Sequence, residues 1–86
     1  MSGYRVIVTA TAVKERQKLD ASIRQSIDKA LQKLLENTRP AGAKKLSGSS
    51  HDWRIRVGDY RILYEVDDEG QLITVWRIAH RREVYR

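Results

Sequence analysis

The alternation of apolar and other residues predicts a strand near the start of the chain. In residues 4–9, a tyrosine and two valines occupy every second position and therefore share one face of an extended segment. A short helix is expected to follow, with Thr11 as its N-cap and Leu19 near its end. This segment of the chain thus predicts a strand that leads directly into a helix.

A second, longer helix is predicted from residues that recur on one buried face. Asp20 is placed to cap its N-terminus, and we expect the helix to end near Asn37, before the turn-forming residues 38–42. The apolar residues with helical spacing are Ile23, Ile27, Ala30, Leu31, Leu34 and Leu35. The polar connector of residues 43–50 follows this helix.

Two alternating runs, residues 53–57 and 60–64, are joined by Gly58-Asp59, which predicts a β-hairpin. One face carries Trp53, Ile55, Val57, Tyr60, Ile62 and Tyr64, and the other carries Arg54, Arg56 and Arg61. A two-residue turn places Arg56 directly opposite Arg61. Like charges that face each other across strands destabilise a sheet. An anion bound between the two side chains would explain the arrangement.

The remaining pattern completes an α+β domain of order βααβββ. Residues 67–70 predict a turn, and residues 72–78 predict a strand that is apolar on both faces and therefore central in its sheet. We expect two N-terminal helices to pack on one face of a small, mostly antiparallel four-stranded sheet. The other face is then open and carries the arginines. Residues 1–86 are expected to form this single domain.

Composition narrows the functional classes. The 86 residues carry a net charge of +6, with clustered arginines, which favours a polyanion or an acidic protein as partner. The absence of cysteine excludes disulfides and thiolate zinc sites, and fits a reducing cytoplasm. We expect no membrane role and no signal peptide, because no apolar run approaches membrane-spanning length.

The candidate chemistry lies in a set of arginine, histidine and tyrosine side chains: Arg54, Arg56, Arg61, His80, Arg81 and Tyr85. One interpretation is a surface that binds RNA, DNA or an acidic peptide without chemistry. The other is metal-free RNA cleavage, in which arginines clamp the phosphate and a histidine or tyrosine moves a proton. No metal site or cofactor is expected, because the carboxylates of residues 67–69 belong to a turn.

The sequence resembles the RelE/ParE superfamily, the toxin halves of bacterial and archaeal toxin–antitoxin pairs. The resemblance covers nearly the whole chain, and the segments that carry it are residues 39–46, 53–57, 58–61 and 80–85. It implies a RelE-like fold. The RelE branch cuts messenger RNA in the ribosomal A site, whereas the ParE branch poisons DNA gyrase and lacks the nuclease residues.

The resemblance also implies roles for single residues. Arg61 matches the phosphate-binding arginine, and Arg81 matches an arginine that helps to protonate or stabilise the leaving group. Tyr85 matches a tyrosine implicated in stacking or as the base. Arg54 and Arg56 match a pair that is lysine in the best-known branch, and arginine effectively cannot lose its proton. They are therefore assigned to charge stabilisation.

The general base is then Tyr85 or His80. The candidate RNA contacts are Lys44, Lys45, His80 and Arg82. For the two lysines, the alternative is a solvated approach to the sheet.

The resemblance further implies a cognate RelB-like antitoxin, with the ribosome and mRNA as the other partners. Three functions stay open at this point. The first is a ribosome-dependent, metal-independent endoribonuclease toxin, and the second is a toxin that binds gyrase. The third is a homologue that binds only its antitoxin, or operator DNA within a complex.

Overall fold

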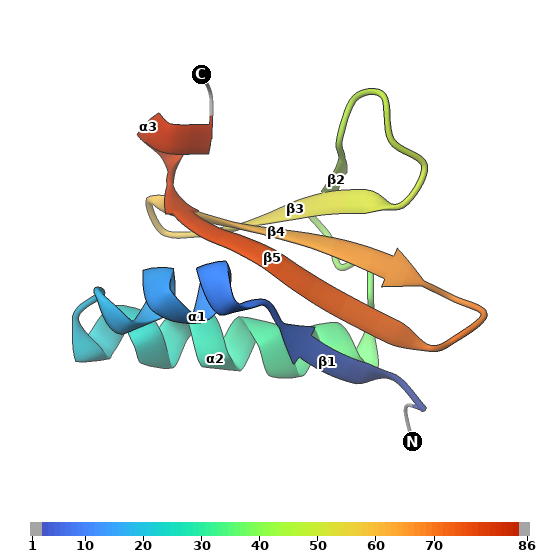
Figure 1. The fold of residues 1–86 in the computed structure, drawn as a ribbon, viewed down its shortest axis with the longest axis horizontal. Helices are drawn as coiled ribbons and strands as arrows, with labels where there is room; N and C mark the ends of the chain where they lie inside the picture. Colours follow the sequence, from blue (N-terminus) through green and yellow to red (C-terminus); the bar gives the residue numbers. More distant parts are fainter. Residues whose placement is uncertain (1–2, 85–86) are drawn as a thin grey trace.

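The computed structural model describes residues 3–84. Its elements, shown in Figure 1, are β1 (Arg5–Val8), α1 (Ala10–Gln17), α2 (Ala21–Glu36), β2 (Lys44–Lys45), β3 (Asp52–Val57), β4 (Tyr60–Asp67), β5 (Leu72–His80) and α3 (Arg81–Val84). The predicted α+β class and the order of the two N-terminal helices and the hairpin are confirmed.

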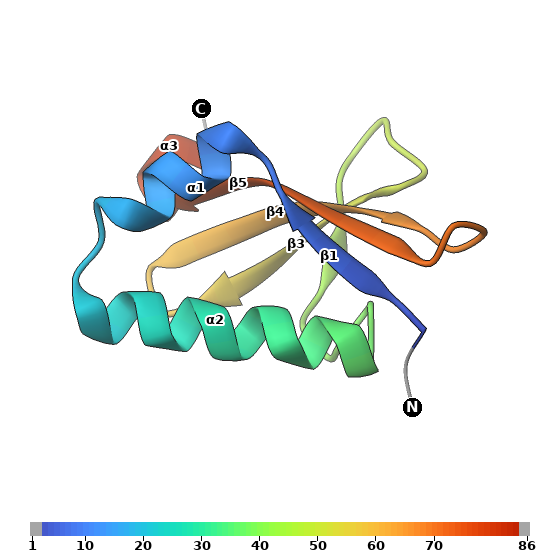
Figure 2. The ribbon, with the colours of Figure 1, turned by 60° about the horizontal axis from the view of Figure 1, so that its bottom comes forward.

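The strands form one sheet in the order β1-β5-β4-β3-β2. β1 runs parallel to β5, and the other neighbouring strands are antiparallel. The helices α1 and α2 lie on one side of the sheet, whereas α3 and the loop after β2 rise on the other side (Figures 1 and 2). The second face therefore has α3 at one end and the β2–β3 loop at the other, and is less open than the sequence predicts.

The prediction of four strands is wrong, because the structure has a fifth. Lys44 pairs with Arg54 and Lys45 pairs with Trp53, so part of the predicted polar connector is β2. A strand of two residues has no alternation that a sequence pattern can reveal. The short helix α3, a single turn after β5, is also absent from the predicted order.

The first helix begins earlier than predicted. The Oγ1 atom of Thr9 accepts a hydrogen bond from the Ala12 backbone N–H, so Thr9 is the N-cap and Thr11 lies within α1. Asp20 does precede α2 as its N-cap residue, but its side chain makes no capping hydrogen bond. The end of α2 at Glu36, with Asn37 as C-cap, agrees with the sequence pattern.

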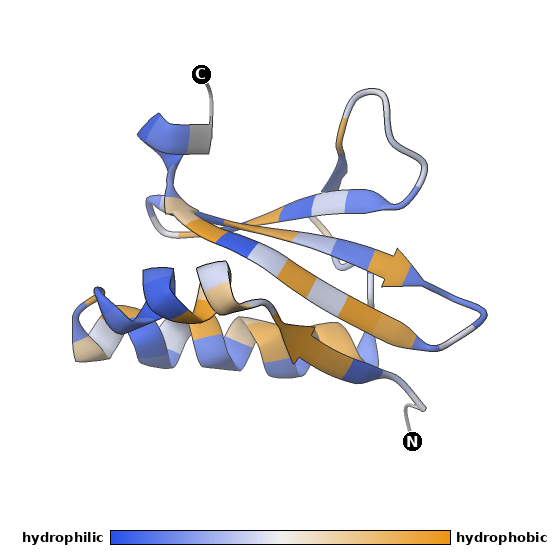
Figure 3. Cartoon of the chain, in the orientation of Figure 1, coloured by the Kyte–Doolittle hydropathy of each residue, from blue (hydrophilic) through white to orange (hydrophobic). Residues whose placement is uncertain are grey.

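The core lies between the sheet and the helices α1 and α2. Its members are Ala12, Ile27, Leu34, Ile55, Ile62, Tyr64, Val66, Ile73, Val75 and Ile78. Figure 3 shows this concentration of apolar residues in β1, β4 and β5, beside a hydrophilic α3. Tyr64 is fully buried, and its hydroxyl donates a hydrogen bond to the Thr38 carbonyl at 2.8 Å. This bond ties the connector after α2 to the centre of the sheet.

The hairpin between β3 and β4 has the predicted two-residue turn. Gly58 has a φ of +59°, a left-handed conformation that glycine adopts without strain, as the first central position of a type II′ turn requires. The resulting register pairs Val57 with Tyr60 and Arg56 with Arg61. The predicted opposition of two arginines is thereby confirmed.

Candidate nucleic-acid site

The face of the sheet opposite α1 and α2 carries a pocket lined by four cationic side chains. Lys44 of β2, Arg54 and Arg56 of β3 and Arg61 of β4 surround a volume of about 270 Å³ together with Gly42. The strand register explains this convergence, since Lys44 pairs with Arg54 and Arg56 pairs with Arg61. Four cations around one small pocket make a site for an anion with several oxygens, such as a phosphate.

Arg61 is the most deeply placed of these cations. Only 8% of it is exposed, which makes it the one charged residue that is buried in the described part of the chain. Its neighbours on the same face, Leu63 and Ala79, are also buried. Its Nη1 atom lies 3.3 Å from the Tyr60 carbonyl oxygen. A guanidinium at the floor of a pocket is shielded from water, which strengthens its attraction for a bound anion.

Arg56 is exposed and held by its own hairpin. Its Nε atom donates a hydrogen bond to the Gly58 carbonyl oxygen at 3.1 Å. The turn therefore fixes the direction of this side chain above the pocket. The two opposed arginines differ in environment, with Arg61 at the floor and Arg56 at the rim.

Arg81 and Arg82 lie on α3, beyond the residues that line the cationic pocket. The Arg81 backbone N–H donates to the Asp59 carbonyl oxygen at 2.8 Å, which joins α3 to the β3–β4 turn. Both side chains are exposed. Tyr85, the predicted base or stacking residue, lies outside the described residues.

His80 is separated from the predicted arginine set. Its ring meets the Tyr60 ring edge-on, with 5.4 Å between centroids, and lines a small cavity with Glu15 of α1 and with Lys18, the C-cap of that helix. Its Nδ1 atom accepts a hydrogen bond from the Arg82 backbone N–H at 3.2 Å. His80 thus caps the start of α3 and does not face the cationic pocket.

Lys45 is also outside the pocket, because it alternates with Lys44 along β2 and pairs with Trp53. It is exposed at the edge of the sheet. Of the nine residues predicted for the site, the structure therefore gathers Lys44, Arg54, Arg56 and Arg61 into one pocket.

Sequence reasoning missed an ionic network next to α3. The Glu15 carboxylate of α1 accepts hydrogen bonds from the Arg77 Nε and the Ile78 backbone N–H, each at 2.8 Å. The Arg77 guanidinium also reaches Glu83 of α3 at 3.3 Å. Hydrogen bonding to Glu15 raises the pKa of Arg77. These partners are 62 residues apart in sequence, so no local pattern signals their contact.

Among residues 3–84, no three histidine or acidic side chains come together as metal ligands would. No helix within the described residues is long and apolar enough to span a membrane.

Comparison with known proteins places the chain in a family. The sequence profile of the "ParE toxin of type II toxin-antitoxin system, parDE" matches residues 6–85. The "mRNA interferase toxin RelE" of Escherichia coli K12 is 35% identical over 78 residues, which cover 86% of this chain and 81% of that protein. The "Toxin RelE" of Mycobacterium tuberculosis is 31% identical over 84 residues, covering 96% and 87%.

A solved structure agrees with this assignment. The archaeal RelE-RelB complex from Pyrococcus horikoshii OT3 contains a chain that superimposes with a TM-score of 0.82. The two chains are 26% identical, and the alignment covers 91% of this chain and 94% of the other. The fold and the site define a small, basic α+β domain with a cationic pocket on its sheet. The chain belongs to the RelE/ParE superfamily of type II toxin–antitoxin toxins, in its RelE-like branch.

Proposed function

We propose that this protein is the mRNA-cleaving toxin of a type II toxin–antitoxin pair, a single domain over residues 1–86 that acts on ribosome-bound message in the cytoplasm. The observation that carries the proposal is the pocket in which Lys44, Arg54, Arg56 and Arg61 converge. The name of its relative, "mRNA interferase toxin RelE", supports the same substrate.

The proposed reaction uses the RNA's own 2′-hydroxyl. Its oxygen bonds to the adjacent phosphorus, the bond to the 5′-oxygen breaks, and the products are a cyclic phosphate and a free 5′-hydroxyl. Arg61 and Arg56 hold the phosphate from two sides and stabilise the negative charge that develops on it. Arg54 and Lys44 complete the cationic wall. DNA lacks the 2′-hydroxyl and would bind without being cleaved.

Proton transfer is assigned to the C-terminal segment. Arg81 supplies a cation for the leaving 5′-oxygen from α3, and Arg82 contacts the RNA backbone beside it. The His80 Nδ1 atom accepts a hydrogen bond from the Arg82 N–H, and this ring lines a different cavity from the arginines, so Tyr85 is the better candidate for the base. Lys45 is proposed as a contact to RNA outside the pocket. The reaction needs no metal or cofactor.

We further propose a RelB-like antitoxin as partner. The solved relative from Pyrococcus horikoshii is a RelE-RelB complex. A net charge of +6 and a cationic pocket favour an acidic segment that folds on this surface.

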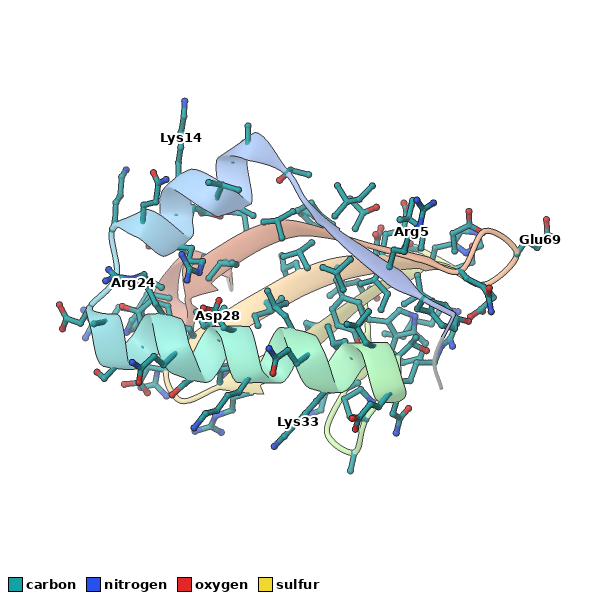
Figure 4. All side chains as sticks on the ribbon, turned by 90° about the horizontal axis from the view of Figure 1, so that it is seen from below. Arg5, Lys14, Arg24, Asp28, Lys33 and Glu69 are labelled. Carbon is teal, nitrogen blue, oxygen red and sulfur yellow. The ribbon has the colours of Figure 1, made fainter. Side chains whose placement is uncertain are left out.

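Primer extension on ribosome-bound message tests the activity. Purified protein is expected to produce cuts within A-site codons, and Arg61→Gln is expected to reduce them by at least tenfold. Lys14→Gln removes a charge from a side chain that projects away from the molecule in Figure 4, and should cut normally. Chelation that spares enough magnesium for ribosome integrity should leave the wild-type rate unchanged. Loss of cleavage on chelation, followed by its return only with added zinc or manganese, would contradict metal independence.

Tyr85→Phe separates the two roles proposed for the tyrosine. If the hydroxyl moves a proton, the rate falls by more than tenfold, within the roughly 10²–10⁴-fold range of general acid–base catalysis. A wild-type rate for Tyr85→Phe with an inactive Tyr85→Ala would assign stacking instead.

A second candidate function, gyrase poisoning, is favoured by the match to the ParE family profile. The cationic pocket argues for the nuclease, because a toxin that only binds gyrase has no need to hold a phosphate for cleavage. Intact message together with accumulating cleaved DNA–gyrase complexes would establish the second function. If the protein shows neither activity but still binds its antitoxin, its function is antitoxin binding only.

A further inference from the structure

Glu15 is an acidic side chain of α1 that reaches the edge of the sheet. The pairing of β1 with β5 starts at Leu72 and ends at Val75. The backbone N–H of Ile78 therefore has no strand neighbour on that side. Glu15 fills the gap with one carboxylate oxygen on this N–H and the other on the Arg77 Nε. The Glu15 side chain is 19% exposed, so the carboxylate is largely shielded from water.

Arg77 passes this contact on to α3. With its Nε atom fixed by Glu15, its Nη2 atom lies 3.3 Å from the Glu83 carboxylate. α3 has a second anchor, since the Arg81 N–H donates to the Asp59 carbonyl of the β3–β4 turn. The helix that carries Arg81 is thus held between the hairpin of the cationic pocket and the Glu15–Arg77 pair.

We propose that Glu15 is a positioning residue for the reaction, acting through Arg77 and Glu83 on the helix that carries Arg81. The inference rests on the proposed function and deepens it. An exposed pair such as Arg77–Glu83 adds little stability. Catalysis is far more sensitive to geometry, since a displacement of about 1 Å can cost roughly 10²-fold in rate. The network therefore matters for rate more than for folding.

The matched control is a second arginine–carboxylate pair on the same helix. Arg16 of α1 binds Asp28 of α2 through two hydrogen bonds of 2.8 and 2.6 Å. Figure 4 shows Asp28 on the side of α2 that faces α1. Glu15→Gln removes one negative charge from the network next to α3. Asp28→Asn removes one negative charge from the Arg16–Asp28 pair, which joins α1 to α2. The glutamine keeps an oxygen for the Ile78 N–H and loses the ionic bond to Arg77.

Two measurements test the proposal in the whole protein: single-turnover cleavage at saturating ribosome concentration, and amide hydrogen exchange of Arg81. We expect Glu15→Gln and Glu83→Gln to lower the rate at least fivefold, with half-saturating concentrations within twofold of wild type. The Arg81 amide should exchange at least threefold faster, while the core amide of Ile62 is unchanged. The double variant should be no slower than the slower single variant, because both act through Arg77.

Asp28→Asn should leave both the rate and the Arg81 exchange at wild-type values. Equal effects of Asp28→Asn and Glu15→Gln would overturn the positioning role and assign Glu15 to general stability. Unchanged Arg81 exchange in Glu15→Gln would overturn it too. If the wild-type protein does not cleave, the proposed function is contradicted. The Arg81 exchange rates of Glu15→Gln and Asp28→Asn then still show whether Glu15 holds α3 in place.

Discussion

Arg56 and Arg61 are directly opposed across the β3–β4 hairpin, which is unfavourable for a sheet in the absence of an anion. Arg56 is exposed at the rim of the pocket, whereas Arg61 is buried at its floor. The hairpin therefore holds two positive charges that a bound phosphate would bridge. This arrangement makes a measurable prediction about stability in the free protein.

Arg56→Gln is expected to raise the free energy of unfolding at low salt by a few tenths of a kcal/mol, about 0.2–1 for a cross-strand pair. The gain should shrink in high salt or phosphate, because screening and anion binding relieve the repulsion in wild type. Lys45→Gln is the control, since it removes the same charge opposite a tryptophan. Thermal melts of wild type and both variants at low and high salt measure the difference. A loss of stability confined to Arg56→Gln would mean that its bond to Gly58 outweighs the repulsion.

Because Tyr64 is buried, we expect the free energy of unfolding to fall at alkaline pH. Burial raises the pKa of Tyr64 to about 12, above the usual value of about 10. Between these pH values the unfolded chain loses a proton that the folded protein keeps, so stability is full below pH 10 and falls as the pH rises. The slope from this residue approaches about 1.4 kcal/mol per pH unit.

Urea unfolding from pH 9 to 11.5 measures that slope, and Tyr64→Phe should reduce it. The variant also loses the hydrogen bond to the Thr38 carbonyl, so it should be less stable at pH 7 by about 1 kcal/mol. Tyr4→Phe is the comparison. The hydrogen bond to Asp68 also raises the pKa of Tyr4, but Tyr4 is less buried than Tyr64, so Tyr4→Phe should reduce the slope less. An identical pH dependence in wild type and Tyr64→Phe would refute the assignment.

The helix starts differ in a way that sequence alone does not show. Thr9 caps α1 through its side chain, whereas Asp20 precedes α2 without a side-chain capping bond. Thr9→Ala should therefore cost about 1 kcal/mol, the usual value of a capping bond. Asp20→Ala should lose only the attraction of its charge for the helix dipole, about 0.3–1 kcal/mol at low salt. Chemical denaturation of both variants in high salt, where only the Thr9 effect should persist, tests the difference.

Patterns within a few residues predicted several elements well. Period-two alternation around Gly58-Asp59 gave the hairpin and its register, and helical spacing gave α2. The start of α1 was misplaced because threonines at positions 9 and 11 are equally good caps by composition. The pair Lys44–Lys45 became a strand only through its partners in β3.

The position of His80 was unpredictable for a geometric reason. β4 and β5 slip in register between Leu63 and Tyr64, so Tyr64 pairs with Val75 but Leu63 pairs with Arg77. This irregularity shifts the alternation of β5, and Ile78 joins the same core as Val75. Counting residues along the strand therefore cannot tell which face His80 occupies. The arginines precede the slip, and their shared face was correctly predicted.

At the scale of the whole molecule, the sheet depends on contacts between distant parts of the chain. β5 lies between β1 and β4, and β1 has β5 as its strand neighbour. A chain that ends at Gly70 would leave β1 without this neighbour and expose one side of β4. We expect this truncated protein to show no cooperative thermal transition by circular dichroism, whereas the full chain unfolds in one step. A cooperative melt of the truncated chain would show that α2 and the hairpin suffice for folding.

The position of β5 in the sheet also bears on how a cell survives making such a protein. During biosynthesis the helices α1 and α2 and the β3–β4 hairpin leave the ribosome before the strand that joins β1 to β4. α3, which carries Arg81, emerges later still. A nascent chain therefore cannot bring the cationic pocket together with α3 until β5 has also been translated. Under the proposed function, a chain abandoned before α3 lacks Arg81 and would not cleave RNA.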